Sequence, residues 1–140
     1  MSLPRIAWSL ALALTLVGLA AGAEEMGPDK VQVLEAYTAP TVPKQKSAEL
    51  YASFVNVETD DRLMGADSAL CERVDLVAAD GAKRPYEEFQ FKEDVEAGFS
   101  PGALHLRLVG LKRPLVQGQS FLVTLHFEAG GALALNVTVK

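Results

Sequence analysis

The chain has 140 residues, with 13 lysines and arginines against 18 aspartates and glutamates, so its formal net charge is −5. This acidic balance provides no general electrostatic attraction to nucleic acid or to anionic lipid. Cys71 is the single cysteine, which excludes an internal disulfide. We expect it to be a buried, small apolar residue. A soft metal ligand or an intermolecular thiol is the alternative.

The N-terminal residues have the composition of a secretory signal peptide. Arg5 precedes an uncharged apolar run over residues 6–21, which ends in small residues and is followed by two glutamates. The run is short for a bilayer span, and no cysteine follows it to carry a lipid anchor. We therefore predict a signal peptide over residues 1–23, cleaved after Ala23, and an exported domain over residues 24–140 without a membrane anchor.

The rest of the chain repeats short runs of β-branched and aromatic residues, bounded by glycine, proline, aspartate or asparagine. We predict strands at 31–37, 49–57, 62–66, 72–78, 88–91, 103–109, 120–127 and 132–139. Long helical periodicity is absent from this part of the sequence, although a short turn of helix near residues 46–49 fits. The pattern predicts an all-β fold, an antiparallel β-sandwich with Greek-key connections.

The last two predicted strands show the alternation most clearly. Phe121, Val123, Leu125 and Phe127 fall on one face of the first strand, and His126 falls on the other with the polar residues. The glycines at 130 and 131 tolerate the positive φ angles of a tight turn. We therefore expect these two strands to pair as a hairpin, with His126 facing solvent.

Motifs for catalysis are missing from the sequence. The predicted mature chain has two imidazole bases, His105 and His126, and neither stands in a recognisable catalytic motif. The acidic pairs at 60–61 and 87–88 are adjacent residues, which point to opposite faces of a strand or lie in solvated turns. Phosphate loops and Cys-x-x-Cys or His-Glu-x-x-His spacings are also absent. The sequence therefore predicts that the protein is not an enzyme.

Two segments resemble a known family. Residues 61–68 (DRLMGADS) with 71–77 (CERVDLV) resemble the first motif strand of periplasmic copper chaperones of the PCu(A)C type, and residues 102–115 (GALHLRLVGLKRPL) resemble their metal-site hairpin. The resemblance extends over about residues 31–140. It implies a cupredoxin-like sandwich that carries Cu(I) in the periplasm toward cytochrome c oxidase. The implied partners are a respiratory copper-site protein or another copper carrier.

The ligand positions that this resemblance implies are mostly replaced. The family binds copper through a histidine at the end of the first motif strand, a methionine about a dozen residues later, and a His-x-Met pair, all suited to soft Cu(I). The corresponding positions here are Val77, a loop at 83–85 without methionine, and His105-x-Arg107. Only His105 is retained. Residues i and i+2 of a strand share a face, so Arg107 would place a positive charge beside a metal on His105.

Two interpretations of the remaining soft groups stay open. A rebuilt site would combine His105 with His126, facing it across paired strands, and with Met26 near the new N-terminus. Cys71 and Met64 precede the first motif strand and are poorly placed to substitute. In the alternative, His105 is a surface or loop-capping histidine. The corresponding functions are Cu(I) carriage and a degenerate family member that acts as a non-metal protein-binding or assembly module.

Overall fold

The computed structural model describes residues 31–140, and all strands and core residues discussed here lie in that range. The predicted signal peptide and Met26 lie outside the described residues. No helix within the described range has the length and apolar character that a bilayer crossing requires. The elements are β1 Gln32–Thr38, β2 Ser47–Val55, β3 Asp61–Asp67, β4 Arg73–Val77, β5 Lys83–Arg84, the 3-10 helix η2 Tyr86–Glu88, β6 Gln90–Phe91, β7 Ala97–Phe99, β8 His105–Val109, β9 Ser120–Phe127 and β10 Gly131–Val139.

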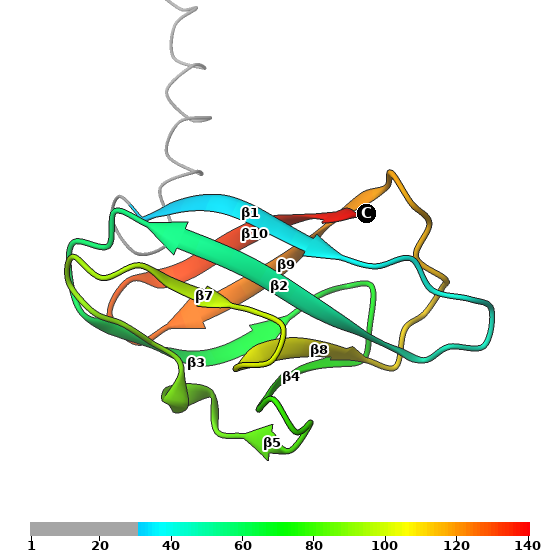
Figure 1. Cartoon of the computed structure of the whole chain (residues 1–140), viewed down its shortest axis with the longest axis horizontal. Coiled ribbons are helices and arrows are strands. Elements are labelled where there is room, and N and C mark those ends of the chain that lie inside the picture. Colours follow the sequence, from blue (N-terminus) through cyan, green and yellow to red (C-terminus); the bar gives the residue numbers. More distant parts are fainter. Residues whose placement is uncertain (1–30) are drawn as a thin grey trace, which may run out of the picture.

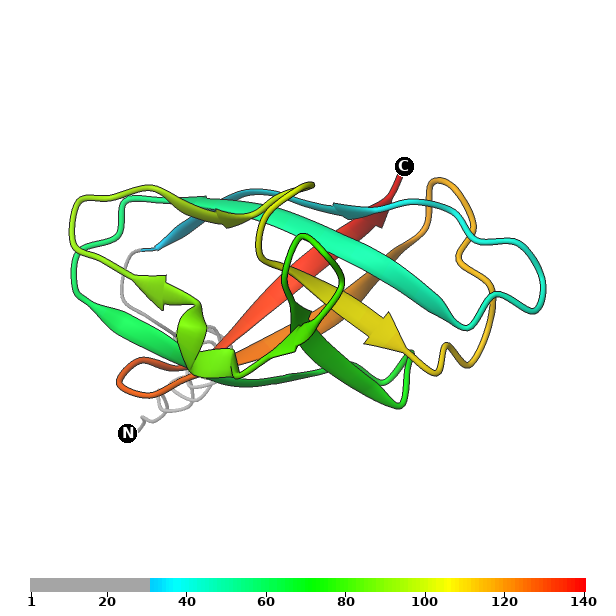
Figure 2. The ribbon, with the colours of Figure 1, turned by 60° about the horizontal axis from the view of Figure 1, so that its bottom comes forward.

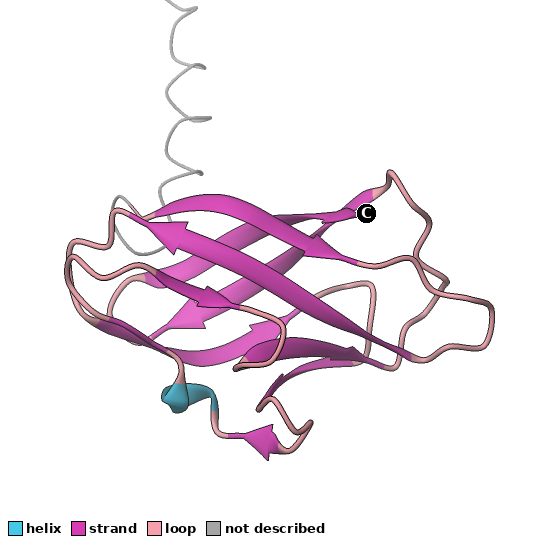
Figure 3. Ribbon diagram, in the orientation of Figure 1, coloured by secondary structure: helices cyan, strands magenta, loops and turns pink. Residues whose placement is uncertain are grey.

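The strands form one curled sheet of 10 strands, in the order β5-β4-β8-β2-β1-β10-β9-β3-β6, with β7 paired to β2. The all-β prediction is confirmed (Figure 3). The prediction of an entirely antiparallel β-sandwich is wrong, because β1 joins the two layers of the sheet (Figure 1). One edge of β1 pairs antiparallel with β2, and its other edge pairs parallel with β10 through Tyr37 and Thr138. The cupredoxin-like description stays a prediction.

Each predicted strand contains observed strand residues, with small shifts at the ends. The prediction of a helical turn near residues 46–49 is wrong, because these residues enter strand β2. Ala48 and Leu50 are buried on its core side, and Glu49 lies on the other side. Two short strands, β5 and β7, were not predicted. Lys83 and Arg84 of β5 are both exposed, so their sequence carries no apolar alternation to detect.

Phenylalanine side chains form the centre of the core between the two layers. Phe54 is fully buried, and its ring packs edge-on against Phe91 at a centroid distance of 5.3 Å and against Phe99 at 6.0 Å. Phe91 stacks in turn on Phe127 at 4.8 Å. Cys71 is also buried, and burial raises the pKa of its thiol. The prediction that Cys71 is a buried, small apolar residue is confirmed.

The predicted hairpin of the last two strands, β9 and β10, is confirmed. Residues 120 to 127 of β9 pair antiparallel with β10, and Gly131 has a φ of 79° where the turn re-enters the strand. Val123, Leu125 and Phe127 are buried, whereas His126 is exposed. The alternation in the sequence therefore sets which face of β9 meets the core.

Truncating the central ring should test this packing. We expect Phe54→Ala to lower the free energy of unfolding by about 3–5 kcal/mol, because it removes a buried ring and leaves a cavity. Leu122→Ala is the matched control, since Leu122 is 60% exposed on β9, and it should change stability by less than about 0.5 kcal/mol. Urea denaturation of both variants measures the difference. Equal losses would contradict the assigned core.

Candidate functional site

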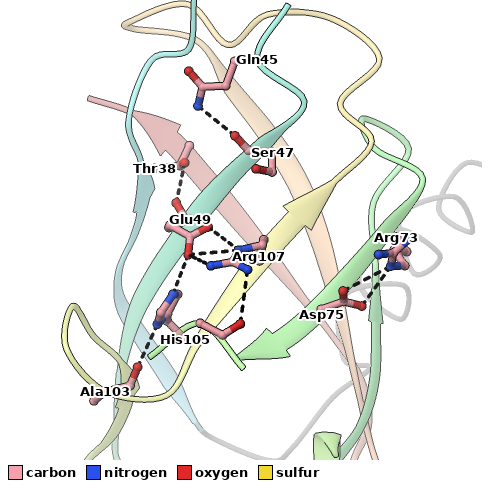
Figure 4. Close-up of polar contacts among 10 residues, drawn as sticks. Thr38, Gln45, Ser47, Glu49, Arg73, Asp75, Ala103, His105 and Arg107 are labelled. Carbon is pink, nitrogen blue, oxygen red and sulfur yellow. Dashed lines mark hydrogen bonds and ion pairs between the residues drawn. The ribbon is translucent and has the colours of Figure 1, made fainter. Parts of the chain in front are cut away.

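The retained histidine and its neighbours lie where β8 runs between β4 and β2. In the β4–β8 pair, Val77 stands opposite His105 and Asp75 stands opposite Arg107. In the β2–β8 pair, Glu49 stands opposite Arg107. Leu106 and Leu108 of β8 point into the core, so the polar residues at 105 and 107 share the outer face of the sheet. The register thus assembles one site from three strands (Figure 4).

His105 is buried, with 5% of its surface exposed, and both of its ring nitrogens are engaged. Nδ1 lies 2.8 Å from the carbonyl oxygen of Ala103, and Nε2 lies 2.7 Å from Oε1 of Glu49. The ring of Tyr51 packs beside it at a centroid distance of 5.4 Å. The contact with Ala103 agrees with a loop-capping role, but the surface location expected from the sequence is wrong because Glu49 and Tyr51 stand beside the ring.

The same carboxylate holds Arg107. Nε of Arg107 lies 2.9 Å from Oε2 of Glu49, and Nη2 lies 3.0 Å from Oε1, so the two side chains form a bidentate ion pair. Nη1 also reaches the carbonyl oxygen of Gly81 at 3.4 Å. Burial acts to raise the pKa of Glu49, but the hydrogen bonds and charges of Arg107 and His105 outweigh it and the pKa is lowered. Glu49 is therefore ionised near neutral pH.

The charges continue across the sheet beyond Arg107. Asp75 of β4 is buried, and its carboxylate accepts hydrogen bonds from Nε of Arg73 at 3.2 and 3.3 Å. Nζ of Lys83 lies 3.7 Å from the same group. Positive and negative side chains therefore alternate from β2 through β8 and β4 to β5. This row places paired ions on the outer face of the sheet.

Glu49 was missed by the sequence reasoning. The available signal was weak: Glu49 interrupts an apolar strand in which Ala48 and Leu50 are core residues, so its side chain has to lie on the opposite face. Only the β2–β8 register shows that this face meets Arg107. A charge partner for Arg107 could be expected from chemistry, but the sequence contains 18 acidic residues from which to choose.

The residues present do not fit a Cu(I) site at the family position. Val77, opposite His105, offers no donor atom, and Arg107 places a cation where the sequence resemblance implies a methionine thioether. Both nitrogens of His105 lie against oxygen atoms, so a metal at either nitrogen would have to displace Ala103 or Glu49. Within residues 31–140, no three side chains of histidine, cysteine, aspartate or glutamate are arranged to share a metal ion.

Among the described residues, the structure does not bring the other predicted donors to His105. His126 lies on β9, and β2, β1 and β10 separate that strand from β8, so the two histidines do not face each other. Nε2 of His126 instead binds Oδ2 of Asp67 at 2.6 Å on the exposed face. The Cys71 thiol contacts the carbonyl oxygen of Arg73 at 3.4 Å. Met26 lies outside the described residues.

Comparison with known proteins identifies the family. Residues 31–139 match the family model "LpqE-like", described as "Putative lipoprotein LpqE-like". The chain belongs to the LpqE-like family. A relative from Leifsonia xyli subsp. xyli, "Putative lipoprotein Lxx21020", is 31% identical over 136 residues, which cover 89% of this chain and 79% of the relative. Residues 1–30 of this LpqE-like chain contain no cysteine, and Cys71 is buried in the domain.

Two solved copper-bound structures share the fold of the LpqE-like chain. The copper-bound PCuAC domain from PmoF2 matches with a TM-score of 0.70 at 23% identity, covering 82% of this chain and 94% of that one. The Cu(I)-bound solution structure of DR1885 from Deinococcus radiodurans matches with a TM-score of 0.63 at 24% identity, covering 89% and 85%. The resemblance to PCu(A)C domains inferred from the sequence is confirmed at the level of the fold.

The pH dependence of stability should report the Glu49 carboxylate. Because its pKa is lowered in the folded state, the ionised group stabilises the fold above its unfolded value of 4.5, and this contribution is lost as pH falls through the folded pKa. We expect Glu49→Gln to lower the free energy of unfolding at pH 7 by about 1–3 kcal/mol. The difference in the free energy of unfolding between the variant and the parent should become smaller below pH 4.5.

The control for this experiment is Glu128→Gln, which removes an exposed carboxylate paired with Arg62. Its effect on stability should be much smaller, because solvent screens an exposed pair. Urea denaturation across a pH series compares the three proteins. Equal stability of Glu49→Gln and the parent at pH 7 would show that the cluster does not support the fold.

Proposed function

We propose that this chain is an extracytoplasmic protein with the fold of a copper chaperone that carries no Cu(I) at His105 and acts as a protein-binding or assembly module. The observation that carries the proposal is the shared carboxylate of Glu49, which binds Arg107 and His105 together. The imidazole of His105, the carboxylate of Glu49 and the guanidinium of Arg107 thus form one bonded cluster. No enzymatic activity is proposed.

Electrostatics oppose a metal cation at this position. Side chains two residues apart on a strand are about 6–7 Å apart, and two unit positive charges at that distance repel by about 2.5 kcal/mol at an effective dielectric constant of about 20. That energy corresponds to an affinity loss on the order of fifty- to a hundredfold. The negative charge of Glu49 offsets part of this repulsion, but its carboxylate oxygens already contact both Arg107 and His105, so a metal would have to compete for them.

The outer face offers groups that suit a protein partner. Tyr37 and Tyr51 are half-buried neighbours on β1 and β2, with ring centroids 5.4 Å apart, and the ring of Tyr51 lies beside that of His105. Tyrosine and arginine are enriched among the residues that dominate binding energy at protein interfaces. The signal-peptide composition of residues 1–23 and the description of the relatives as lipoproteins support a location outside the cytoplasm.

Copper carriage is the second candidate, and the fold favours it. The solved domains that share the fold include two with bound copper, and His105 retains one of the implied ligand types. In this case the protein would pass Cu(I) to a respiratory copper-site protein such as cytochrome c oxidase, or to another copper carrier. His105 would have to leave Glu49 and recruit donors from elsewhere, with Met26 as the helper, because β2, β1 and β10 separate His126 from β8.

A Cu(I) competition titration separates the two candidates. The chain 24–140 is titrated against a competing chelator, beside His105→Ala and the double variant Val77→His, Arg107→Met. We expect the parent to bind Cu(I) no more tightly than His105→Ala, because His105 is already fully bonded. The double variant should gain affinity, since it returns two soft donors to the face that carries His105.

The opposite result would favour carriage. A stoichiometric, tight complex of the parent with one Cu(I), lost in His105→Ala, would overturn the module proposal. Circular dichroism of each variant before titration confirms that a change in affinity does not arise from unfolding.

A further inference from the structure

The charges of the domain are separated between its two ends. The β1–β2 loop, residues 39–46, and the β8–β9 loop, residues 110–119, lie at the same end of the molecule (Figures 1 and 2). We call these two loops the cationic end. They carry four exposed basic residues and no acidic residue, although the chain has a net charge of −5. The basic residues are Lys44, Lys46, Lys112 and Arg113.

The opposite end is acidic. The loops at 56–60, 92–96 and 128–130 lie together there (Figure 1), and Lys92 is their one basic residue. Their acidic residues are Glu58, Asp60, Glu93, Asp94, Glu96 and Glu128. The domain therefore carries an electric dipole along its long axis. An anionic surface would attract one end and repel the other, which orients the molecule before contact.

Hydrogen bonds join the two loops of the cationic end into one platform. The backbone N–H of Thr41 donates to the carbonyl oxygen of Leu115 at 3.0 Å, and the N–H of Leu115 donates to Oγ1 of Thr41 at 2.8 Å. The N–H groups of Gly110 and Leu111 both donate to the carbonyl oxygen of Lys46, at 2.9 and 3.0 Å. Leu115 is 1% exposed, so it anchors the second loop in the core.

Apolar side chains project from this platform. Val42 in the first loop is 65% exposed, and Val116 in the second is 53% exposed. Each follows a residue of the hydrogen-bonded pair at 41 and 115, so both are held by ordered backbone. Glu72, whose N–H donates to the carbonyl oxygen of Gly110 at the base of the second loop, offsets part of the positive charge. Exposed valines flanked by lysines suit the boundary between phosphate headgroups and acyl chains.

We propose that the cationic end docks on an anionic phospholipid surface, with its four basic residues near the headgroup phosphates and its valines at the acyl boundary. The residue types favour lipid over an acidic protein. Three of the four basic residues are lysines, and the two loops contain no aromatic residue. The centre of a protein interface is typically depleted of lysine and enriched in tyrosine, tryptophan and arginine. The net charge alone predicts no lipid binding; its separation into two ends changes that expectation.

Vesicle flotation tests the proposal with the chain 24–140, which contains every described strand and the core and lacks the apolar run at 6–21. The vesicles are phosphatidylcholine alone, or phosphatidylcholine with about one third phosphatidylglycerol. We expect binding only to the anionic vesicles, and loss of that binding at high salt as the charges are screened. Binding to both compositions, or to neither, would overturn the proposal.

Paired charge variants locate the contact. Each basic residue near an anionic surface raises partitioning about fivefold, so Lys44→Gln with Lys46→Gln should weaken binding about 25-fold. The matched control is Lys83→Gln with Lys92→Gln, which removes the same charge from residues away from the cationic end and should change binding less than about twofold. Val42→Ser with Val116→Ser should weaken binding without changing its salt dependence. Equal loss in both lysine pairs would contradict docking through this end.

Discussion

The carboxylate of Glu49 is bonded to two groups at once, and the character of the site depends on it. Arg107 reaches it with two nitrogen atoms, and His105 reaches it with Nε2. The contact ties β2 to β8 across the outer face of the sheet. It also leaves His105 without a ring nitrogen for a metal, because Ala103 engages the other one. One acidic side chain thus ties β2 to β8 and engages the histidine that the sequence resemblance implies as a copper ligand.

The fold and the site have diverged to different extents. The LpqE-like chain keeps the backbone arrangement of PCuAC domains over most of its length. That arrangement depends on buried apolar side chains such as Phe54 and Leu106, which pack the same core whether or not a metal is present. Ligands on the outer face contribute little to that core. They can therefore be exchanged for an ion pair while the sheet persists.

The sequence predicted the parts of the structure that depend on local patterns. The alternation over residues 120–127 placed β9 and the face of His126, and the spacing of His105 and Arg107 placed both on one face of β8. Glu49 was missed because its role follows from the register between β2 and β8, which are far apart in the chain. The parallel pairing of β1 with β10 and the charge separation between the ends likewise arise from topology.

The nitrogen NMR signals of the His105 ring, recorded on the chain 24–140 with and without one equivalent of Cu(I), test the central claim most directly. If Glu49 and Ala103 hold both ring nitrogens as the distances indicate, the two signals stay unchanged when Cu(I) is added. A large shift of the Nε2 signal would show that copper displaces Glu49. That result would contradict the replacement of the metal site by the ion pair.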